Sequence, residues 1–104
     1  MQHYMVQASF TPETWTKLLD KPKGRREALR AAIEKLGGTL DGLWLSFGDY
    51  DLVLLCSMPD NVSSAAFAMA ASACGSLKAS KTTPLLAPEE GLVAMEKAYM
   101  ENMS

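Results

Sequence analysis

Two largely apolar runs, at residues 43–47 and 52–56, flank a Gly-Asp turn, and this feature constrains the fold more than any other. Gly48 can adopt a positive φ without strain, and Asp49 tolerates left-handed conformations and can hydrogen-bond its own backbone. The pattern predicts a β-hairpin that joins a strand at residues 39–47 to a strand at residues 51–58.

The first third of the chain predicts a strand followed by an interrupted helix. Residues 3–10 alternate between apolar and mixed side chains, which indicates a strand with one strongly apolar face. Thr11 can cap the free amides of a helix, Pro12 fits its first turn, and Pro22 bends or breaks it. Gly37 and Gly38 end it. Before them, apolar residues spaced three and four apart form a stripe: Ala28, Leu29, Ala32, Ile33 and Leu36.

The second half predicts a helix, an edge strand and a terminal helix. Asp60 or Asn61 begins an alanine-rich helix that reaches about Cys74, and Phe67 and Met69 supply its bulky side chains. Residues 77–86 form a polar strand whose threonines and lysines suit the edge of a sheet. A helix at residues 88–102 follows, and its apolar stripe contains Leu92, Met95, Tyr99 and Met103.

The order β-α-β-β-α-β predicts one ferredoxin-like α+β domain over residues 1–104, with its core at 3–86 and the C-terminal helix at 88–102. Right-handed crossovers place both inner helices on one face of a four-stranded antiparallel sheet. The other face should also be apolar, because residues 52–56 do not alternate and Trp44 and Met5 add large side chains. We therefore predict that the chain associates with itself, as a homodimer or a higher oligomer, and that its sheets pack face to face in a dimeric α/β barrel. The alternative cover is the C-terminal helix, folded back across the sheet.

Composition excludes several classes of protein. The chain has 48% hydrophobic and 21% charged residues, which is typical of a globular domain, and its apolar runs are too short to span a membrane. No export signal precedes the first strand, so we expect a cytoplasmic protein with no membrane partner. Cys56 and Cys74 are then expected to be reduced thiols packed in the interior. We identify no basic partner that would make either one a redox catalyst.

Seven of the ten basic residues lie between positions 17 and 35. We interpret them as a solvated helix face, on which Glu27 and Arg30 are spaced as a helical ion pair. The alternative, a nucleic-acid or anion surface, would be expected to carry interleaved aromatic residues. The strand at 51–58 also lacks the stacking aromatics of RNA-recognition domains, which share this topology, so we expect no nucleic-acid partner.

Three short motifs resemble the GYD-domain family of small bacterial proteins. They are Leu36-Gly37-Gly38 after the first helix, Phe47-Gly48-Asp49-Tyr50-Asp51 at the hairpin, and Pro59-Asp60 before the second helix. The resemblance runs from about His3 to Leu86. It implies the dimeric α/β-barrel fold and assembly, and it implies no particular reaction because the family has no established general activity.

Seven residues are candidates for ligand contact, at the second sheet face or at the hairpin: His3, Met5, Gln7, Trp44, Tyr50, Asp51 and Ser57. Apolar walls with a few polar groups are typical of a ligand site, but aromatic residues and methionine are also enriched in interface cores. Adjacent strand residues point to opposite faces, so Tyr50 and Asp51 are interpreted first as turn residues, with Asp51 accepting hydrogen bonds from turn amides. His3 could act as a general base, but one histidine does not make a histidine-based zinc or iron site. We predict no metal and no cofactor, and we assign no catalytic residue.

The sequence therefore predicts a small homodimer that binds a small, partly apolar molecule between its two sheets. One alternative is a non-catalytic structural or regulatory module whose second sheet face forms a dry dimer interface. Another alternative, by fold analogy alone, is a cofactor-free enzyme such as an oxygenase or isomerase.

Overall fold

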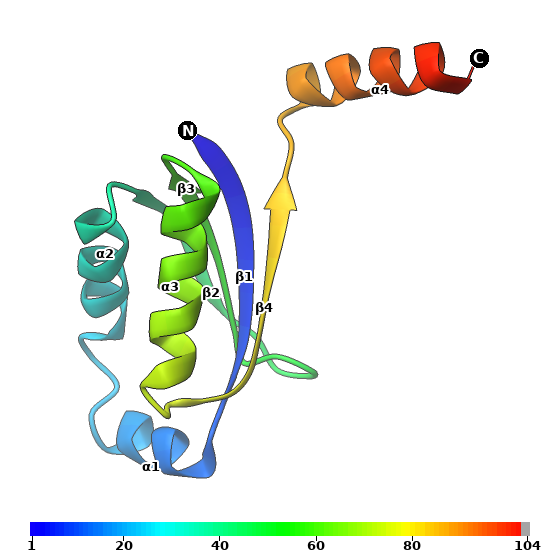
Figure 1. Ribbon diagram of the computed structural model, residues 1–104. Helices are drawn as coiled ribbons and strands as arrows, with labels where there is room; N and C mark the ends of the chain where they lie inside the picture. Colours follow the sequence, from blue (N-terminus) through cyan, green and yellow to red (C-terminus); the bar gives the residue numbers. More distant parts are fainter. Residues whose placement is uncertain (103–104) are drawn as a thin grey trace.

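The computed structural model describes residues 1–102, and its strands and helices are shown in Figure 1. Along the chain the elements are β1 (Gln2–Phe10), α1 (Pro12–Asp20), α2 (Arg25–Lys35), β2 (Thr39–Leu45), β3 (Leu52–Met58), α3 (Asn61–Ala73), β4 (Leu77–Leu85) and α4 (Pro88–Asn102). Met103, which was expected in the stripe of the last helix, lies outside the described residues.

The four strands form an antiparallel sheet in the order β2-β3-β1-β4, and α2 and α3 lie on one of its faces (Figure 1). This arrangement is the predicted ferredoxin-like α+β fold. The polar strand β4 takes an edge position, as expected from its lysines and threonines.

Local signals place the helix starts as predicted. The Thr11 hydroxyl accepts from the Thr14 amide at the start of α1, and the Asp60 carboxylate accepts from the Ser63 amide at 2.8 Å at the start of α3. This hydrogen bond lowers the pKa of Asp60 from its ordinary value. The predicted break near Pro22 separates α1 from α2, and Gly24 allows the chain to turn there with a φ of 98°.

The hydrophobic core lies between the sheet and the helices. Its buried members are Tyr4, Val6, Phe10, Ile33, Leu52, Leu54, Cys56, Met58 and Phe67. Two expectations about packing were wrong. Met69 is 70% exposed because it lies on the outer side of α3, and Cys74 is exposed just beyond the end of that helix.

The hairpin connection is longer than predicted. β2 ends at Leu45 and β3 begins at Leu52, so residues 46–51 form a loop. Side chains alternate along a strand, so the predicted strand at residues 39–47 would place Leu43, Leu45 and Phe47 on one face. Only Leu43 packs against the core, whereas Leu45 is 73% exposed and Phe47, beyond the end of the strand, is fully exposed.

Helix α4 extends away from the rest of the subunit (Figure 1). The radius of gyration is 16.3 Å, compared with about 13 Å for a compact domain of this length. The large apolar side chains of α4 are all more than half exposed: Leu92, Val93, Met95, Tyr99 and Met100. The alternative in which this helix folds back over its own sheet is therefore not observed. No helix within residues 1–102 is long and apolar enough to cross a membrane.

Candidate functional site

The candidate site lies on the sheet face opposite α2 and α3, which we call the open face. Directly paired residues of antiparallel strands point to the same side of a sheet, so the pairing defines rows of side chains across the open face. The first row is Thr39, Ser57, His3 and Leu85; the second is Gly42, Leu55, Met5 and Thr83; the third is Trp44, Val53, Gln7 and Lys81. Five of the seven candidates from the sequence, namely His3, Met5, Gln7, Trp44 and Ser57, thus share one surface.

The centre of the open face is apolar. Trp44 is 55% exposed, and Met5, Val53 and Leu55 are partly exposed around it. The indole ring of Trp44 lies over Gly42, since a Cβ atom placed on that glycine would be only 2.5 Å from the ring. An apolar, partly aromatic surface without a covering helix is typical of an interaction or binding site.

A polar cluster lies at one end of this surface. Ser57 donates its hydroxyl proton to Asp41 Oδ2 at 2.6 Å, and His3 Nδ1 lies 3.1 Å from Ser57 Oγ. Because the single hydroxyl proton is used by the carboxylate, Ser57 can only accept from His3, which places the ring proton on Nδ1. His3 Nε2 then carries a free lone pair on an exposed ring, where it can accept a hydrogen bond or a proton. Ser57 itself is held as a link between His3 and Asp41.

Asp41 was not among the residues predicted from sequence. It reaches Ser57 because the β2–β3 pairing shifts register between Leu40 and Gly42, which makes Asp41 the extra residue of a β-bulge. A signal was present, since Asp and Gly are both depleted in strands and a glycine inside a strand often marks a bulge. The adjacent Asp41-Gly42 pair in the middle of a strand could therefore have identified the site.

A hollow of about 320 Å³ adjoins the polar cluster. Its lining includes His3, Asp41, Leu55 and the Leu85–Ala87 segment that leads into α4. Cys56 also borders it, but burial, with a further contribution from the charge of Asp41, raises the pKa of that thiol to about 11. The thiol therefore stays protonated near neutral pH and is a poor nucleophile. The volume is within the range of about 300–1,000 Å³ that is usual for small-molecule sites.

The remaining two candidates, Tyr50 and Asp51, lie at the other end of the sheet. Asp51 accepts from the Phe10 amide through Oδ2 at 2.9 Å, and its own amide donates to the Ala8 carbonyl at 2.8 Å. The expectation that Asp51 accepts from turn amides was therefore wrong, because its carboxylate fixes the hairpin to the end of β1. Ala8 is five residues along β1 from His3, a separation of roughly 17 Å. The structure does not bring Tyr50 and Asp51 together with His3 and Ser57.

Within residues 1–102, no group of three or more His, Cys, Asp or Glu side chains lies close enough to hold a metal ion. The arrangement on the open face instead offers hydrogen bonding and proton transfer at one end and apolar contact at the other.

Comparison with solved structures supports the fold. MtbAldR superposes with a TM-score of 0.60 at 13% identity, covering 83% of this chain and 53% of that one, so this chain spans about half its length. TTHA0845 from Thermus thermophilus superposes with a TM-score of 0.55 at 18% identity, and the match covers 84% of this chain and 95% of TTHA0845. FFRP-DM1 superposes with a TM-score of 0.53 at 13% identity, and the match covers 83% of this chain and 100% of FFRP-DM1. Identities this low show similarity of fold alone.

Comparison of sequences identifies the family. No curated protein matches this sequence. The model of the GYD domain matches residues 4–95, which include the hairpin loop, the open face except His3, and the first half of α4. The chain belongs to the GYD domain family.

Proposed function

We propose that the protein is a homodimer whose two open faces pack against each other and enclose a small, partly apolar molecule, whose polar end binds His3. The observation that carries the proposal is the composition of the open face. Large apolar side chains occupy its centre, and the hydrogen-bonded His3–Ser57–Asp41 cluster lies at one end beside a hollow.

The energetics of the open face favour a second copy as its cover. Trp44 is 55% exposed, and its neighbours Met5, Val53 and Leu55 remain partly in contact with solvent. Burying a large apolar side chain contributes roughly 1.5–3 kcal/mol, so leaving this surface in water would be unfavourable. A two-fold axis over the sheet would cover both subunits with the same residues.

The chemistry of the ligand follows from the two ends of the site. The Trp44 and Leu55 surface would accommodate an aromatic or aliphatic body. His3 Nε2, with Nδ1 bonded to Ser57, would accept a hydrogen bond from a hydroxyl or N–H group of the ligand. A small phenol or aliphatic alcohol combines these features.

A second candidate function is proton abstraction, as in an isomerase without a cofactor. The observation that favours it is the orientation of the cluster, because Asp41 orients Ser57, Ser57 orients His3, and His3 is an exposed residue. A base held in one orientation and able to return the proton is what an isomerisation requires.

Native mass spectrometry of freshly purified protein tests the proposal, because it reports stoichiometry and any retained small molecule together. We expect a dimer with additional mass, and a small molecule in the denatured extract. His3→Ala should keep the dimer and lose the additional mass, whereas Lys81→Ala, two rows away on the same face, should keep both. A monomer at micromolar concentration would overturn the dimer. A dimer that neither carries nor takes up such molecules would support a dry interface.

A further inference from the structure

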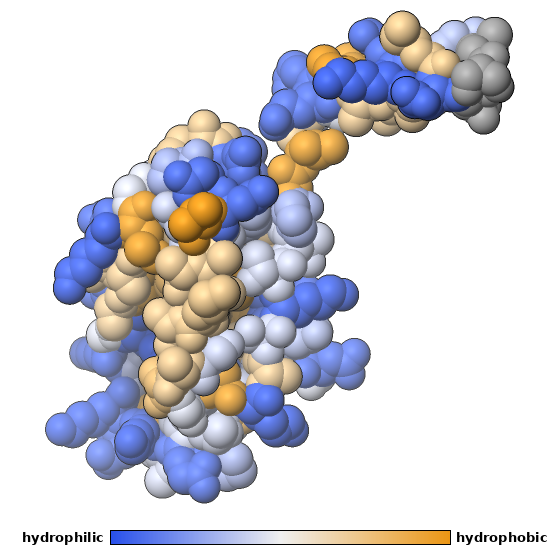
Figure 2. Space-filling view, in the orientation of Figure 1, coloured by the Kyte–Doolittle hydropathy of each residue, from blue (hydrophilic) through white to orange (hydrophobic). Residues whose placement is uncertain are grey.

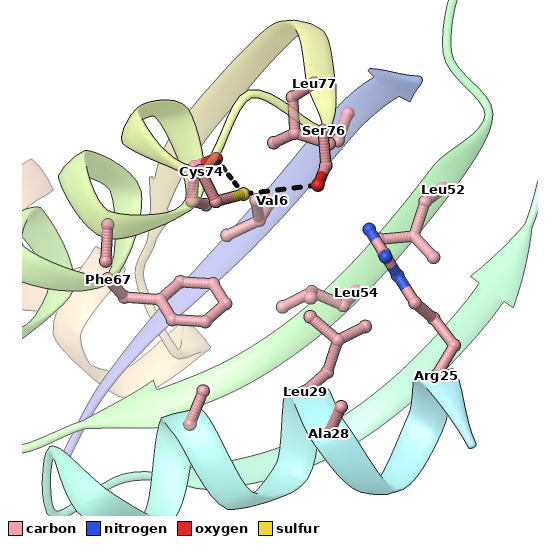
Figure 3. Close-up of a pocket in the computed structure, with 14 residues that line it drawn as sticks. Val6, Arg25, Ala28, Leu29, Leu52, Leu54, Phe67, Cys74, Ser76 and Leu77 are labelled. Atoms are coloured by element: carbon pink, nitrogen blue, oxygen red, sulfur yellow. Dashed lines mark hydrogen bonds between the residues drawn. The ribbon is translucent and has the colours of Figure 1, made fainter. Parts of the chain in front are cut away.

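A second hollow lies on the opposite side of the sheet, between α2 and α3, and we call it the helix groove (Figure 3). Its volume is about 260 Å³. Val6 and Leu54 of the sheet form its floor, and Leu29 of α2 and Phe67 of α3 form its walls. The lining is almost entirely apolar.

The helix groove exists because the two helices present alanines at this position. Ala28 and Ala32 of α2 have the spacing of a core-facing stripe, but both remain exposed at the groove. Ala70 and Ala71 line it from α3. Figure 2 shows the weakly apolar strip that the alanine-rich α3 contributes to this face of the molecule. Small side chains on both helices leave a space that larger residues would have filled.

Arg25 is the one charged side chain among the residues that line the helix groove. Its guanidinium lies over the Phe10 ring, 5.0 Å from the centroid, and its Nε atom is buried without a hydrogen-bond partner. Arg30 pairs with Glu27, but within residues 1–102 no carboxylate pairs with Arg25. Asp20 borders a neighbouring hollow with Arg25 but forms no ion pair with it. A buried donor on a cation without a partner is costly, so a bound acceptor would relieve it.

The polar side chains that line the helix groove, those of Arg25, Cys74 and Ser76, lie at the end of the groove formed by the start of α2 and the end of α3. Figure 3 shows Arg25 reaching from the start of α2 toward Ser76 and Cys74 at the end of α3. The Cys74 thiol proton is directed at the Ala71 carbonyl at 3.0 Å, so the Ser76 hydroxyl, 3.4 Å from Cys74 Sγ, donates to that sulfur. The hydrogen bond with Ser76 lowers the pKa of Cys74, and the positive charge of Arg25 contributes.

We propose that the helix groove binds a small organic acid, with its apolar body against Leu29, Leu54 and Phe67 and its carboxylate paired with Arg25. The size of the groove fits this class, since a dry cavity of about 150 Å³ can hold benzene. A volume of about 260 Å³ therefore accommodates an aromatic ring with a short chain that carries the carboxylate. Arg25 supplies a planar, permanently charged fork that matches a carboxylate.

This proposal is independent of the function proposed for the open face, because the two sites lie on opposite sides of the sheet and share none of the residues named for binding. Either site can be tested while the other is intact.

Titration with two matched probes, followed by amide resonances in nuclear magnetic resonance spectra, tests the helix groove. The probes are 3-phenylpropionate and its neutral analogue 3-phenylpropionamide, which have the same shape. We expect saturable shifts at Leu29, Phe67 and Cys74 with the acid, and roughly tenfold or more weaker binding of the amide. Arg25→Gln should abolish the preference for the acid, whereas Arg26→Gln, the same change at the next residue, should retain it. Ala71→Leu should block both probes by filling the groove.

Alkylation of Cys74 by iodoacetamide gives a second readout that does not depend on the spectra. The acid should slow this reaction in the unchanged protein and in Arg26→Gln, but not in Arg25→Gln. Equal binding of the acid and the amide, an absence of shifts in groove residues, or shifts confined to His3 and Leu55 would each overturn the proposal.

Discussion

Replacement of Trp44 by alanine tests the proposed dimer at its most informative position. Trp44 lies in the third row of the open face and leaves 55% of its surface exposed. A tryptophan side chain buries up to about 250 Å², so roughly 140 Å² per subunit is available for burial in an interface. At about 25 cal/mol per Å² this area corresponds to about 3.5 kcal/mol per subunit, and a symmetric dimer contains two copies.

The total of about 7 kcal/mol is an upper limit, because alanine retains part of the contact and a partner covers only part of the exposed ring. Taking half of it, we expect Trp44→Ala to weaken the dimer by about 3.5 kcal/mol, which is a roughly 300-fold increase in the dissociation constant. Sedimentation velocity over a concentration series measures this constant directly. Circular dichroism would verify that the subunit remains folded.

Met69→Ala is the matched control for this experiment. Met69 is 70% exposed, more than Trp44, but it lies on α3 on the opposite side of the sheet. Its replacement should leave the dissociation constant unchanged. If the protein is a dimer and Trp44→Ala changes the constant by no more than Met69→Ala does, the interface lies elsewhere and the reasoning from the open face is refuted.

Three further outcomes follow from the packing of the subunit. Gly38→Ala should lower the free energy of unfolding by about 3 kcal/mol, since a Cβ atom there would lie 2.5 Å from the Ser57 carbonyl oxygen. Gly91→Ala should not lower it, because a Cβ atom on Gly91 would meet nothing within 4 Å. Urea titration of both variants measures the difference. Burial raises the pKa of Cys56 from 9.0 to about 11. The folded protein therefore holds this proton more tightly than the unfolded chain, and stability should fall as pH rises between those values, by up to about 1.4 kcal/mol per pH unit. Urea titrations at a series of pH values between 9.0 and about 11 measure this fall, and the free energy of unfolding of Cys56→Ala should decrease less steeply with pH, by that amount. A thiol reagent should label Cys74 alone in the folded protein and both cysteines after unfolding, since Cys74 is exposed with a lowered pKa and Cys56 is buried.

The elements of the fold could be predicted because their signals are local. Thr11 and Asp60 cap helices through amides three residues away, and Pro22 interrupts a helix by its own covalent structure. The non-alternating apolar run of β3 correctly indicated that both sides of this strand are apolar. Signals of this kind act within a few residues and do not depend on the rest of the structure.

The sites could be predicted only in part because they depend on juxtapositions across the fold. Asp41 acts on Ser57, sixteen residues later, through a bulge that shifts the pairing register. Arg25 influences Cys74 across the helix groove, although sequence spacing gave no basic partner for either cysteine. The exposure of Met69 was missed because α3 is so rich in alanine that its apolar pattern defines no single buried face.

Helix α4 connects the fold to the proposed assembly. An isolated helix of 15 residues is marginal in water, and the apolar side chains of α4 find no cover on their own subunit. The helix leaves the sheet from the end of β4, beside His3, whose partner in that pairing is Leu85. Leu86 and Ala87, which precede α4, line the hollow at the polar cluster. In a dimer formed by two open faces, α4 could pack on the partner subunit and at the same time fix one wall of this hollow. One contact with a second copy would then cover the open face, stabilise α4 and complete the ligand site, which is why we favour the same chain over an unrelated partner.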